Sequence, residues 1–319
     1  MALHDRREAR RREIRRRRLA LAALAAVALA AVVVIALARG GASSRTPRPD
    51  AHPASASSGG AAGAKGGSSS DLGKPSSGPP GTEPVPILMY HVIAAPPPGA
   101  PFPGLYVPPG EFATQMQALK SAGWHAVTLD QVEAYWRRGV ALGAGKPIVL
   151  SFDNGYQSQY TQAFPVLRRL GWVGVENVQL TGLPPSQGGL GTGEIRGLVS
   201  AGWELDTQGF SHADLITLDA QQLHYQVAVA RSVVQQRYHV PVNWFCYPSG
   251  DYDATVVAAV QSAGYLGSTT VVPGWAHPTD DPYQLPRLRV LGGTTPQELL
   301  GLLSSIRDDP PAPESYGSA

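Results

Sequence analysis

The sequence predicts an α/β fold in which a parallel β-sheet curls into a barrel. Within residues 85–307, short apolar and β-branched runs alternate with longer segments whose apolar residues recur at the helical period of 3.6. Seven or eight such βα units in one domain are typical of a barrel-like sheet, and an open doubly wound sheet is the alternative. A single cysteine, Cys246, excludes an intrachain disulfide or a thiolate metal cluster as the framework of this fold.

The predicted strands are eight short apolar runs. They lie at residues 87–90, 126–129, 148–152, 173–180, 203–206, 244–247, 265–270 and 288–291. In a parallel sheet of this kind, chemistry takes place just beyond the carboxyl ends of the strands. The residues that directly follow the runs are therefore the first candidates for a site.

The predicted helices are amphipathic. In residues 110–122, Phe112, Met116 and Leu119 share one face, as expected for a helix that packs on a sheet. Further helices are expected at residues 130–138, 159–170, 194–201, 220–238, 254–263 and 296–306, with Asp130, Asp253 and Thr295 as N-caps.

The N-terminal segments predict export. Residues 1–18 are a basic tail with nine Arg against three acidic residues, so the rest of the chain carries a net charge of −4, which argues against nucleic acid as a partner. Residues 19–38 are an unbroken run of Leu, Ala, Val and Ile, long enough to span the roughly 30 Å hydrocarbon core as a helix. The run predicts a single transmembrane signal anchor, with a cleaved signal peptide as the alternative, and both place the folded part outside the cytoplasm.

A linker follows the apolar run. Gly, Ser, Pro and Ala make up 34 of the 46 residues at 39–84, so this segment cannot bury a core and is expected to be a disordered tether. Residues 85–307 are then one domain, and residues 308–319 are a polar tail.

Three predicted strand ends carry residues that chemistry uses. They are Asp153-Asn154-Gly155 after the third run, Gln208 and His212 after the fifth, and a Pro-Ser-Gly turn at 248–250 after the sixth. Taken alone, Asp-Asn-Gly is a tight turn and the histidine is a loop residue. In a barrel, all three groups would lie on one face.

Five ordered segments extend the pattern along the domain: Pro-Ile-Leu-Met-Tyr-His at 86–91, Leu-Ser-Phe-Asp-Asn-Gly-Tyr at 150–156, the segment 202–215, Trp-Phe-Cys-Tyr-Pro-Ser-Gly at 244–250 and Leu-Pro-Arg-Leu-Arg at 285–289. In this order they resemble the polysaccharide deacetylase family, the NodB-homology domains of carbohydrate esterase family 4. The resemblance implies a distorted (β/α) barrel that hydrolyses N-acetyl groups. It also implies N-acetylated polysaccharide or peptidoglycan as the partner.

The resemblance implies a metal site as well. A divalent ion, Zn²⁺ or Co²⁺, would be held by one carboxylate and two imidazoles, and a second carboxylate would take a proton from water. Asp153 matches the base and His212 matches one ligand. Asn154 and Gln208 stand at the other two ligand positions, where the family has Asp and His. Two neutral amides at these positions lower the expected affinity for such metals steeply.

Other site roles follow from the same resemblance. Tyr247 matches the position whose backbone N–H holds the oxyanion, and Arg287 is expected to orient Asp153 through a charge-assisted bond. His91, Tyr156 and Pro248 are expected to line the substrate cleft.

Asp206 lies two residues before Gln208, so it would share a face with it on a strand. It is the candidate for a substitute acid, and a solvated strand-end acid is the alternative. An exposed aromatic such as Trp275 is compatible with a glycan partner.

Two functions remain open from the sequence. One is a membrane-anchored deacetylase that works with an altered metal site. The other is a catalytically degenerate member that keeps the sugar cleft and binds glycan without cleaving it.

Overall fold

The computed structural model describes residues 78–183 and 188–307. The predicted basic tail, the transmembrane run 19–38, most of the linker and the polar tail lie outside the described residues. Among the residues it describes, every helix is too short or too polar to cross a membrane.

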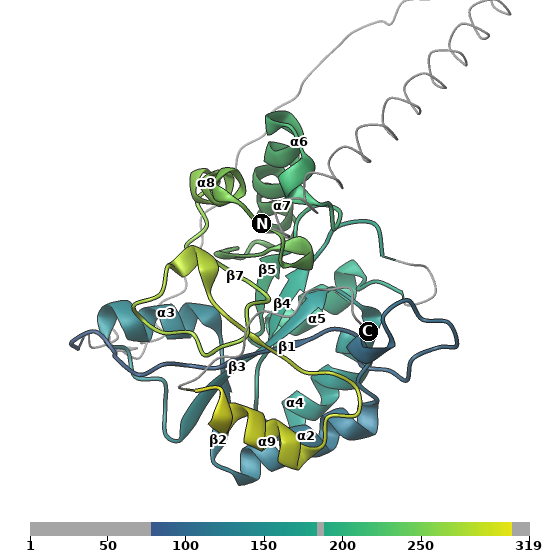
Figure 1. Ribbon diagram of the computed structural model, residues 1–319, viewed down its shortest axis with the longest axis vertical. Coiled ribbons are helices and arrows are strands. Elements are labelled where there is room, and N and C mark those ends of the chain that lie inside the picture. The colour runs from purple at the N-terminus through teal and green to yellow at the C-terminus, as the bar shows by residue number, and fades with distance from the viewer. Residues whose placement is uncertain (1–77, 184–187, 308–319) are drawn as a thin grey trace, which may run out of the picture. The chain divides into compact units, whose positions relative to one another are not determined.

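The described strands form one parallel eight-stranded sheet (Figure 1). They are β1 Ile87–Tyr90, β2 Trp124–Val127, β3 Lys146–Asn154, β4 Val175–Val178, β5 Glu204–Thr207, β6 Trp244–Cys246, β7 Gly267–Thr269 and β8 Leu288–Arg289. The order across the sheet is β7-β6-β5-β4-β3-β1-β8, and β2 pairs with β3. The predicted α/β class and parallel sheet are confirmed.

The sheet is a curled half-barrel. Its end strands β7 and β8 are joined through a bridge between Thr269 and Leu285, supported by a 2.9 Å bond from the Thr270 N–H to the Leu285 carbonyl. Because Leu285 precedes β8, this contact brings the segment before β8 against β7. All neighbouring strands are parallel, so the carboxyl ends of β1, β3, β5 and β6 lie at the same edge of the sheet.

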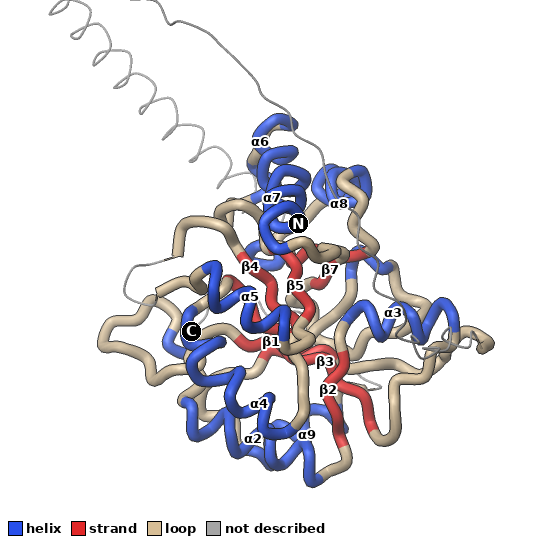
Figure 2. The backbone as a smooth tube through the Cα atoms, turned by 180° about the vertical axis from the view of Figure 1, so that it is seen from behind, coloured by secondary structure: helices blue, strands red, loops and turns tan. Residues whose placement is uncertain are grey.

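Helices cover the sheet (Figure 2). The α-helices are α2 Pro109–Ser121, α3 Leu129–Arg138, α4 Phe164–Leu170, α5 Thr192–Ser200, α6 Ala220–His224, α7 Ala230–Tyr238, α8 Ala254–Ser262 and α9 Pro296–Ser305. Helix α2 packs against both α4 and α9, while α6, α7 and α8 gather near the ends of β5 and β7. The Tyr90, Phe112 and Phe152 rings, 5.2–6.0 Å apart, join the sheet to α2.

Helix boundaries follow side-chain caps. Asp253 and Thr295 cap α8 and α9 as predicted. The prediction of Asp130 was wrong, because Thr128 is the N-cap of α3: its hydroxyl accepts from the Gln131 N–H, and the Gln131 side chain accepts from the Thr128 N–H in a capping box. The cap also ends the preceding strand at Val127, two residues earlier than predicted.

Two predicted helices are interrupted. Residues 159–170 begin with a π-helix, η2, at Gln159–Ala163, and residues 220–238 contain a second one, η4, at Tyr225–Val229 between α6 and α7. A π-turn holds one more residue per turn than an α-helix, which shifts the direction of the side chains that follow. The apolar period alone gave no sign of either insertion.

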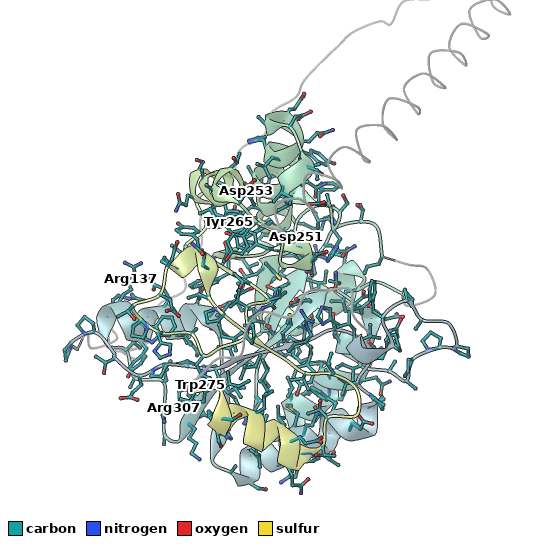
Figure 3. All side chains as sticks on the ribbon, viewed as in Figure 1. Arg137, Asp251, Asp253, Tyr265, Trp275 and Arg307 are labelled. Carbon is teal, nitrogen blue, oxygen red and sulfur yellow. The ribbon has the colours of Figure 1, made fainter. Side chains whose placement is uncertain are left out.

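Trp275 is buried, contrary to the expectation of an exposed aromatic. Its exposed fraction is 8%, and its ring lies 5.9 Å from that of Trp124 in an edge contact. The Arg307 guanidinium lies 5.3 Å from the same ring, and Figure 3 shows the two residues together below the sheet. Trp275 therefore stabilises the domain and is not available to a ligand.

Gly267 begins β7 where the chain leaves no room for a side chain. A Cβ there would meet the Pro282 carbonyl oxygen and lie 2.5 Å from the Trp244 ring. Gly267→Ala is expected to lower the free energy of unfolding by about 1–3 kcal/mol, measured by urea denaturation. Gly301→Ala is the control, because open space surrounds that helical glycine, and stability should rise by about 1 kcal/mol. Equal effects at the two glycines would contradict this account of the packing.

Candidate functional site

The carboxyl edge of the sheet gathers most of the predicted site residues. Asp153, Asn177 and Asp206 are register partners on β3, β4 and β5, so their side chains share a face of the sheet. Arg287, just before β8, reaches the same interior from the other side of the half-barrel. The closure of the sheet therefore brings a carboxylate and a guanidinium together from positions 134 residues apart.

Asp153 and Arg287 form a buried bidentate ion pair. Each carboxylate oxygen of Asp153 accepts from one guanidinium nitrogen at 2.8 Å, and both residues are 1% exposed. Asn177 donates to the same carboxylate at 2.9 Å, and the Cys246 thiol lies 3.5 Å from it. The charge-assisted bond expected between Arg287 and Asp153 is therefore present.

This pairing fixes the protonation of the site. Burial alone would raise the pKa of Asp153, but the positive charge and hydrogen bonds of Arg287 outweigh it and lower that pKa to about 2. The His91 Nε2 lies 3.9 Å from Asp153 Oδ2, yet burial, with help from Arg287, lowers the pKa of His91 to about 4. At neutral pH the site contains a carboxylate, a guanidinium and a neutral imidazole.

The two amides at the family's ligand positions belong to a hydrogen-bonded chain. The Asn154 N–H donates to Gln208 Oε1 at 2.9 Å, and the Asn154 side-chain amide donates to Gln179 Oε1 at 2.7 Å. Gln179 in turn donates to the Thr181 carbonyl at 2.9 Å. Asn154 adopts a left-handed backbone with φ of 80°, a conformation that Asn tolerates. Side chains and backbone thus close around the positions that would hold a metal.

The residues present do not fit the family's divalent metal. Within residues 78–183 and 188–307, no three His, Cys, Asp or Glu side chains come together as ligands. Asp153 is bound on both oxygens by Arg287, and Gln208 Oε1 is bound to a backbone N–H. A Zn²⁺ or Co²⁺ ion would have His212 as its one imidazole donor from the predicted set.

The other predicted residues are spread along the same edge. His212 is exposed, and desolvation lowers its pKa while the charge of Asp153 opposes the shift. Tyr156 is half-buried, and burial raises its pKa to about 12. Pro248 is buried at the start of the 3₁₀-helix η5, Pro248–Gly250. Their roles in binding remain predictions.

Tyr247 does not present a free backbone N–H. That group donates to the Thr269 carbonyl at 3.3 Å, which continues the pairing of β6 with β7. The Tyr247 hydroxyl points away to the Tyr283 carbonyl, 3.0 Å distant. An oxyanion role for this N–H would require it to give up this hydrogen bond, and the role stays a prediction.

Two buried glutamines that the sequence did not single out hold the site loops. Gln159, in η2, donates to the carbonyls of His91 and Asp153 at 2.9 and 2.8 Å. Gln226, in η4, accepts from the N–H groups of Phe210 and Ser211, both at 2.9 Å. Each therefore fixes the backbone of one motif. A polar residue on the apolar stripe of a predicted helix is the one signal that could have found them.

A pocket of about 220 Å³ opens beside this network. Gly155 and Gln179 contribute to its wall, together with α5 residues and with Arg237 and Tyr238 from the end of α7. Neither Asp153 nor His212 lines it. The ion pair is therefore not part of the wall of this pocket.

Asp206 is not a solvated strand-end acid in the described structure. It is fully buried, and its Oδ1 accepts from the N–H groups of Asn243 and Trp244 at 3.1 and 2.9 Å. Its side chain also contacts the carboxyl of Glu204, whose Oε2 accepts from the Asp130 N–H at 2.8 Å. Burial raises the pKa of Asp206 to about 7 and raises that of Glu204 well above its usual value. Burial thus favours a proton shared within the pair over two ionised carboxylates.

This acid pair predicts a pH-dependent stability. A carboxyl whose folded pKa is raised stabilises the fold below its unfolded pKa, near 4, and loses that contribution as the pH rises to about 7. Each such proton changes the free energy of unfolding by about 1.4 kcal/mol per pH unit in that range. Glu204→Gln keeps an acceptor for the Asp130 N–H and removes one titrating carboxyl, so the variant should gain stability relative to the wild type between pH 4 and 7.

The comparison uses urea unfolding of both proteins at each pH. His91 titrates in the same range with the opposite sign, because its folded pKa is lowered, but it contributes to both proteins and cancels in the difference. A difference that stays constant from pH 4 to 7 would contradict the shared proton.

Fold and site together define the class of this domain: a parallel α/β half-barrel with an acid at the carboxyl end of its third strand. Residues 143–267 match the family model described as polysaccharide deacetylase. The protein YxkH of Bacillus subtilis (strain 168), classed among the polysaccharide deacetylases, is 25% identical over 226 residues, which is 70% of this chain and 77% of YxkH. These comparisons confirm the resemblance to the polysaccharide deacetylase family seen in the sequence.

Two further comparisons are more limited. A stretch of 61 residues is 39% identical to the poly-beta-1,6-N-acetyl-D-glucosamine N-deacetylase of Escherichia coli (strain K12), covering 19% of this chain and 9% of that enzyme. The structure of the Streptococcus pyogenes deacetylase PplD in complex with acetate superposes with a TM-score of 0.64 at 24% identity, over 69% of this chain and 98% of that one. The latter likeness concerns the fold.

Proposed function

We propose that this protein is a membrane-tethered, extracytoplasmic member of the polysaccharide deacetylase family that binds N-acetylated glycan without metal-dependent hydrolysis. One observation carries the proposal. Amides occupy two of the three ligand positions, and they are engaged in hydrogen bonds: the Asn154 N–H donates to Gln208 Oε1 at 2.9 Å and the Asn154 side chain donates to Gln179 at 2.7 Å. The remaining donors favour recognition of neutral polar groups over activation of water.

The state of Asp153 argues against a proton acceptor. A general base works best when its pKa lies near the operating pH, and the pKa of Asp153 is lowered to about 2. Arg287 also donates to the Thr270 carbonyl and to the Ser151 hydroxyl, so the guanidinium is held in place and keeps Asp153 ionised, which works against proton uptake.

The class of ligand follows from the relatives and the exposed groups. The Escherichia coli relative acts on poly-beta-1,6-N-acetyl-D-glucosamine, as its name states. The exposed His212 and the half-buried Tyr156 can exchange hydrogen bonds with the hydroxyl and amide groups of a neutral sugar. Cell-wall or exopolysaccharide glycan is therefore the proposed partner.

The apolar run 19–38 and the linker 39–84 support the proposed location. A flexible chain as long as the linker has a root-mean-square span of roughly 40 Å. Such a tether would let the domain reach glycan above the membrane while residues 1–18 stay in the cytoplasm.

The test separates binding from turnover. We would titrate the full chain in detergent with N-acetylglucosamine hexamer, with EDTA and then with added Zn²⁺ or Co²⁺, and assay acetate release in parallel. The expected result is binding that EDTA leaves unchanged and no acetate release. Release that depends on added metal would overturn the proposal in favour of a deacetylase with an altered site. If the chain neither binds the hexamer nor releases acetate, the proposal of a glycan partner is itself overturned.

A further inference from the structure

Phe210 and Tyr225 form an aromatic pair beside the candidate site. Their ring centroids are 4.3 Å apart, with the ring planes tilted by 34°. Phe210 lies between Gln208 and His212 on the loop that follows β5, and Tyr225 comes from the start of η4. Tyr225 is 45% exposed, which is unusual for a large aromatic residue already in contact with another ring. The pair therefore presents apolar surface at the carboxyl edge of the sheet.

The loop that carries Phe210 is held rigidly. Gln226 accepts from the N–H groups of Phe210 and Ser211, and its own amide donates to the Ser211 hydroxyl at 2.8 Å. The Phe210 carbonyl accepts from the Thr181 N–H at 2.8 Å. Gly209 allows the loop to turn, because its φ of 90° is strained for other residues. A ring mounted this way loses little conformational freedom when a ligand covers it.

The π-helix explains why Tyr225 and Gln226 both serve this loop. They are adjacent in sequence, and on a regular α-helix neighbours point about 100° apart. In η4, Gln226 binds the loop backbone while Tyr225 contacts the Phe210 ring. Single π-turns occur frequently at functional sites. Figure 1 shows the α6–α7 region that contains η4 standing beside the end of β5.

We propose that the Phe210–Tyr225 pair is a platform on which a pyranose ring of the bound glycan stacks. The inference rests on the proposed function and names a subsite for it. The face of an aromatic ring is negative, and the C–H groups on one face of a pyranose are weakly positive, so the two faces attract while both lose apolar surface to solvent. Gln208 and His212, two residues to either side of Phe210, place the platform within reach of a sugar bound at the carboxyl edge.

The test is a binding measurement on the full chain in detergent with N-acetylglucosamine hexamer. Tyr225→Ala should weaken binding about fivefold to tenfold, as expected for loss of one aromatic contact. Tyr225→Phe keeps the ring and should bind within about twofold of the wild type. Tyr225→Phe should melt at the wild-type temperature, and Tyr225→Ala, which loses the contact with Phe210, should melt only a few degrees lower, so both variants stay folded in the binding measurement.

Leu266→Ala is the matched control. Leu266 is 43% exposed and lies just before β7, at the amino edge of the sheet, so its loss should not affect binding. Equal binding by Tyr225→Ala and the wild type would overturn the platform while leaving the proposed function intact. A wild-type chain that binds no hexamer would overturn the proposed function first.

Discussion

Arg287→Met should lower the free energy of unfolding by about 3–5 kcal/mol, measured by urea denaturation. The substitution keeps most of the side-chain volume but leaves the Asp153 carboxylate buried without its cation. Asn177 at 2.9 Å and the weak thiol donor Cys246 at 3.5 Å remain, and these are far less than two charge-assisted bonds at 2.8 Å. The loss is a large part of the stability of an ordinary domain. Asp153 would then be forced towards its protonated form, and the stability of the variant should fall as the pH rises.

A second variant keeps this prediction testable if the first does not fold. Asp153→Asn combined with Arg287→Met removes both charges, and it should recover more than half of the lost stability because no unpaired charge remains. Arg137→Met is the control. Arg137 pairs with Glu133 at 3.3 Å on the surface of α3, where Figure 3 places it away from the core, so its loss should cost no more than about 0.5 kcal/mol. A loss at Arg287 no greater than at Arg137 would contradict the buried pair.

The order of the elements could be predicted from the sequence because each strand is a short apolar run between polar turns. The run 87–90 matches β1 residue for residue, and the caps at Asp253 and Thr295 were legible because each is a small polar residue directly before an apolar period. The error at Asp130 arose because Thr128 and Gln131 form a reciprocal cap that depends on spacing, whereas Asp130 has only the right residue type.

The site could be predicted less completely. The pairing of Asp153 with Arg287 was expected from a family resemblance, since no local pattern links residues so far apart. The contacts of Asn154 with Gln208 and Gln179 depend on the curl of the sheet, which sequence spacing does not give. The place of Asp206 at a strand end suggested a solvated acid. In the structure the neighbouring strand β6 covers it, with the Trp244 N–H bound to its carboxylate, and this burial raises its pKa. Tertiary closure decided each of these outcomes.

Asn154→Asp combined with Gln208→His should create metal affinity that the wild type lacks. With His212, the double variant has one carboxylate and two imidazoles, the ligand types that Zn²⁺ and Co²⁺ prefer. We expect Zn²⁺ to bind at micromolar concentration or better, at least about 100-fold more tightly than to the wild type, by calorimetric titration of the full chain. The left-handed backbone at Asn154 tolerates Asp as well as Asn, so the first substitution should not disturb the turn.

The melting temperature gives an independent measure of metal binding at the same site. A ligand that binds only the folded state raises stability by about 2.7 kcal/mol at 100 times its Kd, so Zn²⁺ should raise the melting temperature of the double variant and leave the wild type unchanged. Adding His212→Ala to the double variant should abolish both effects, because one carboxylate and one imidazole are too few for a tight site. Micromolar binding by the wild type would instead mean that the amides hold a real metal site. Binding without hydrolysis would then be overturned, because it requires that the hydrogen bonds among Asn154, Gln208 and Gln179 have taken the place of the ion.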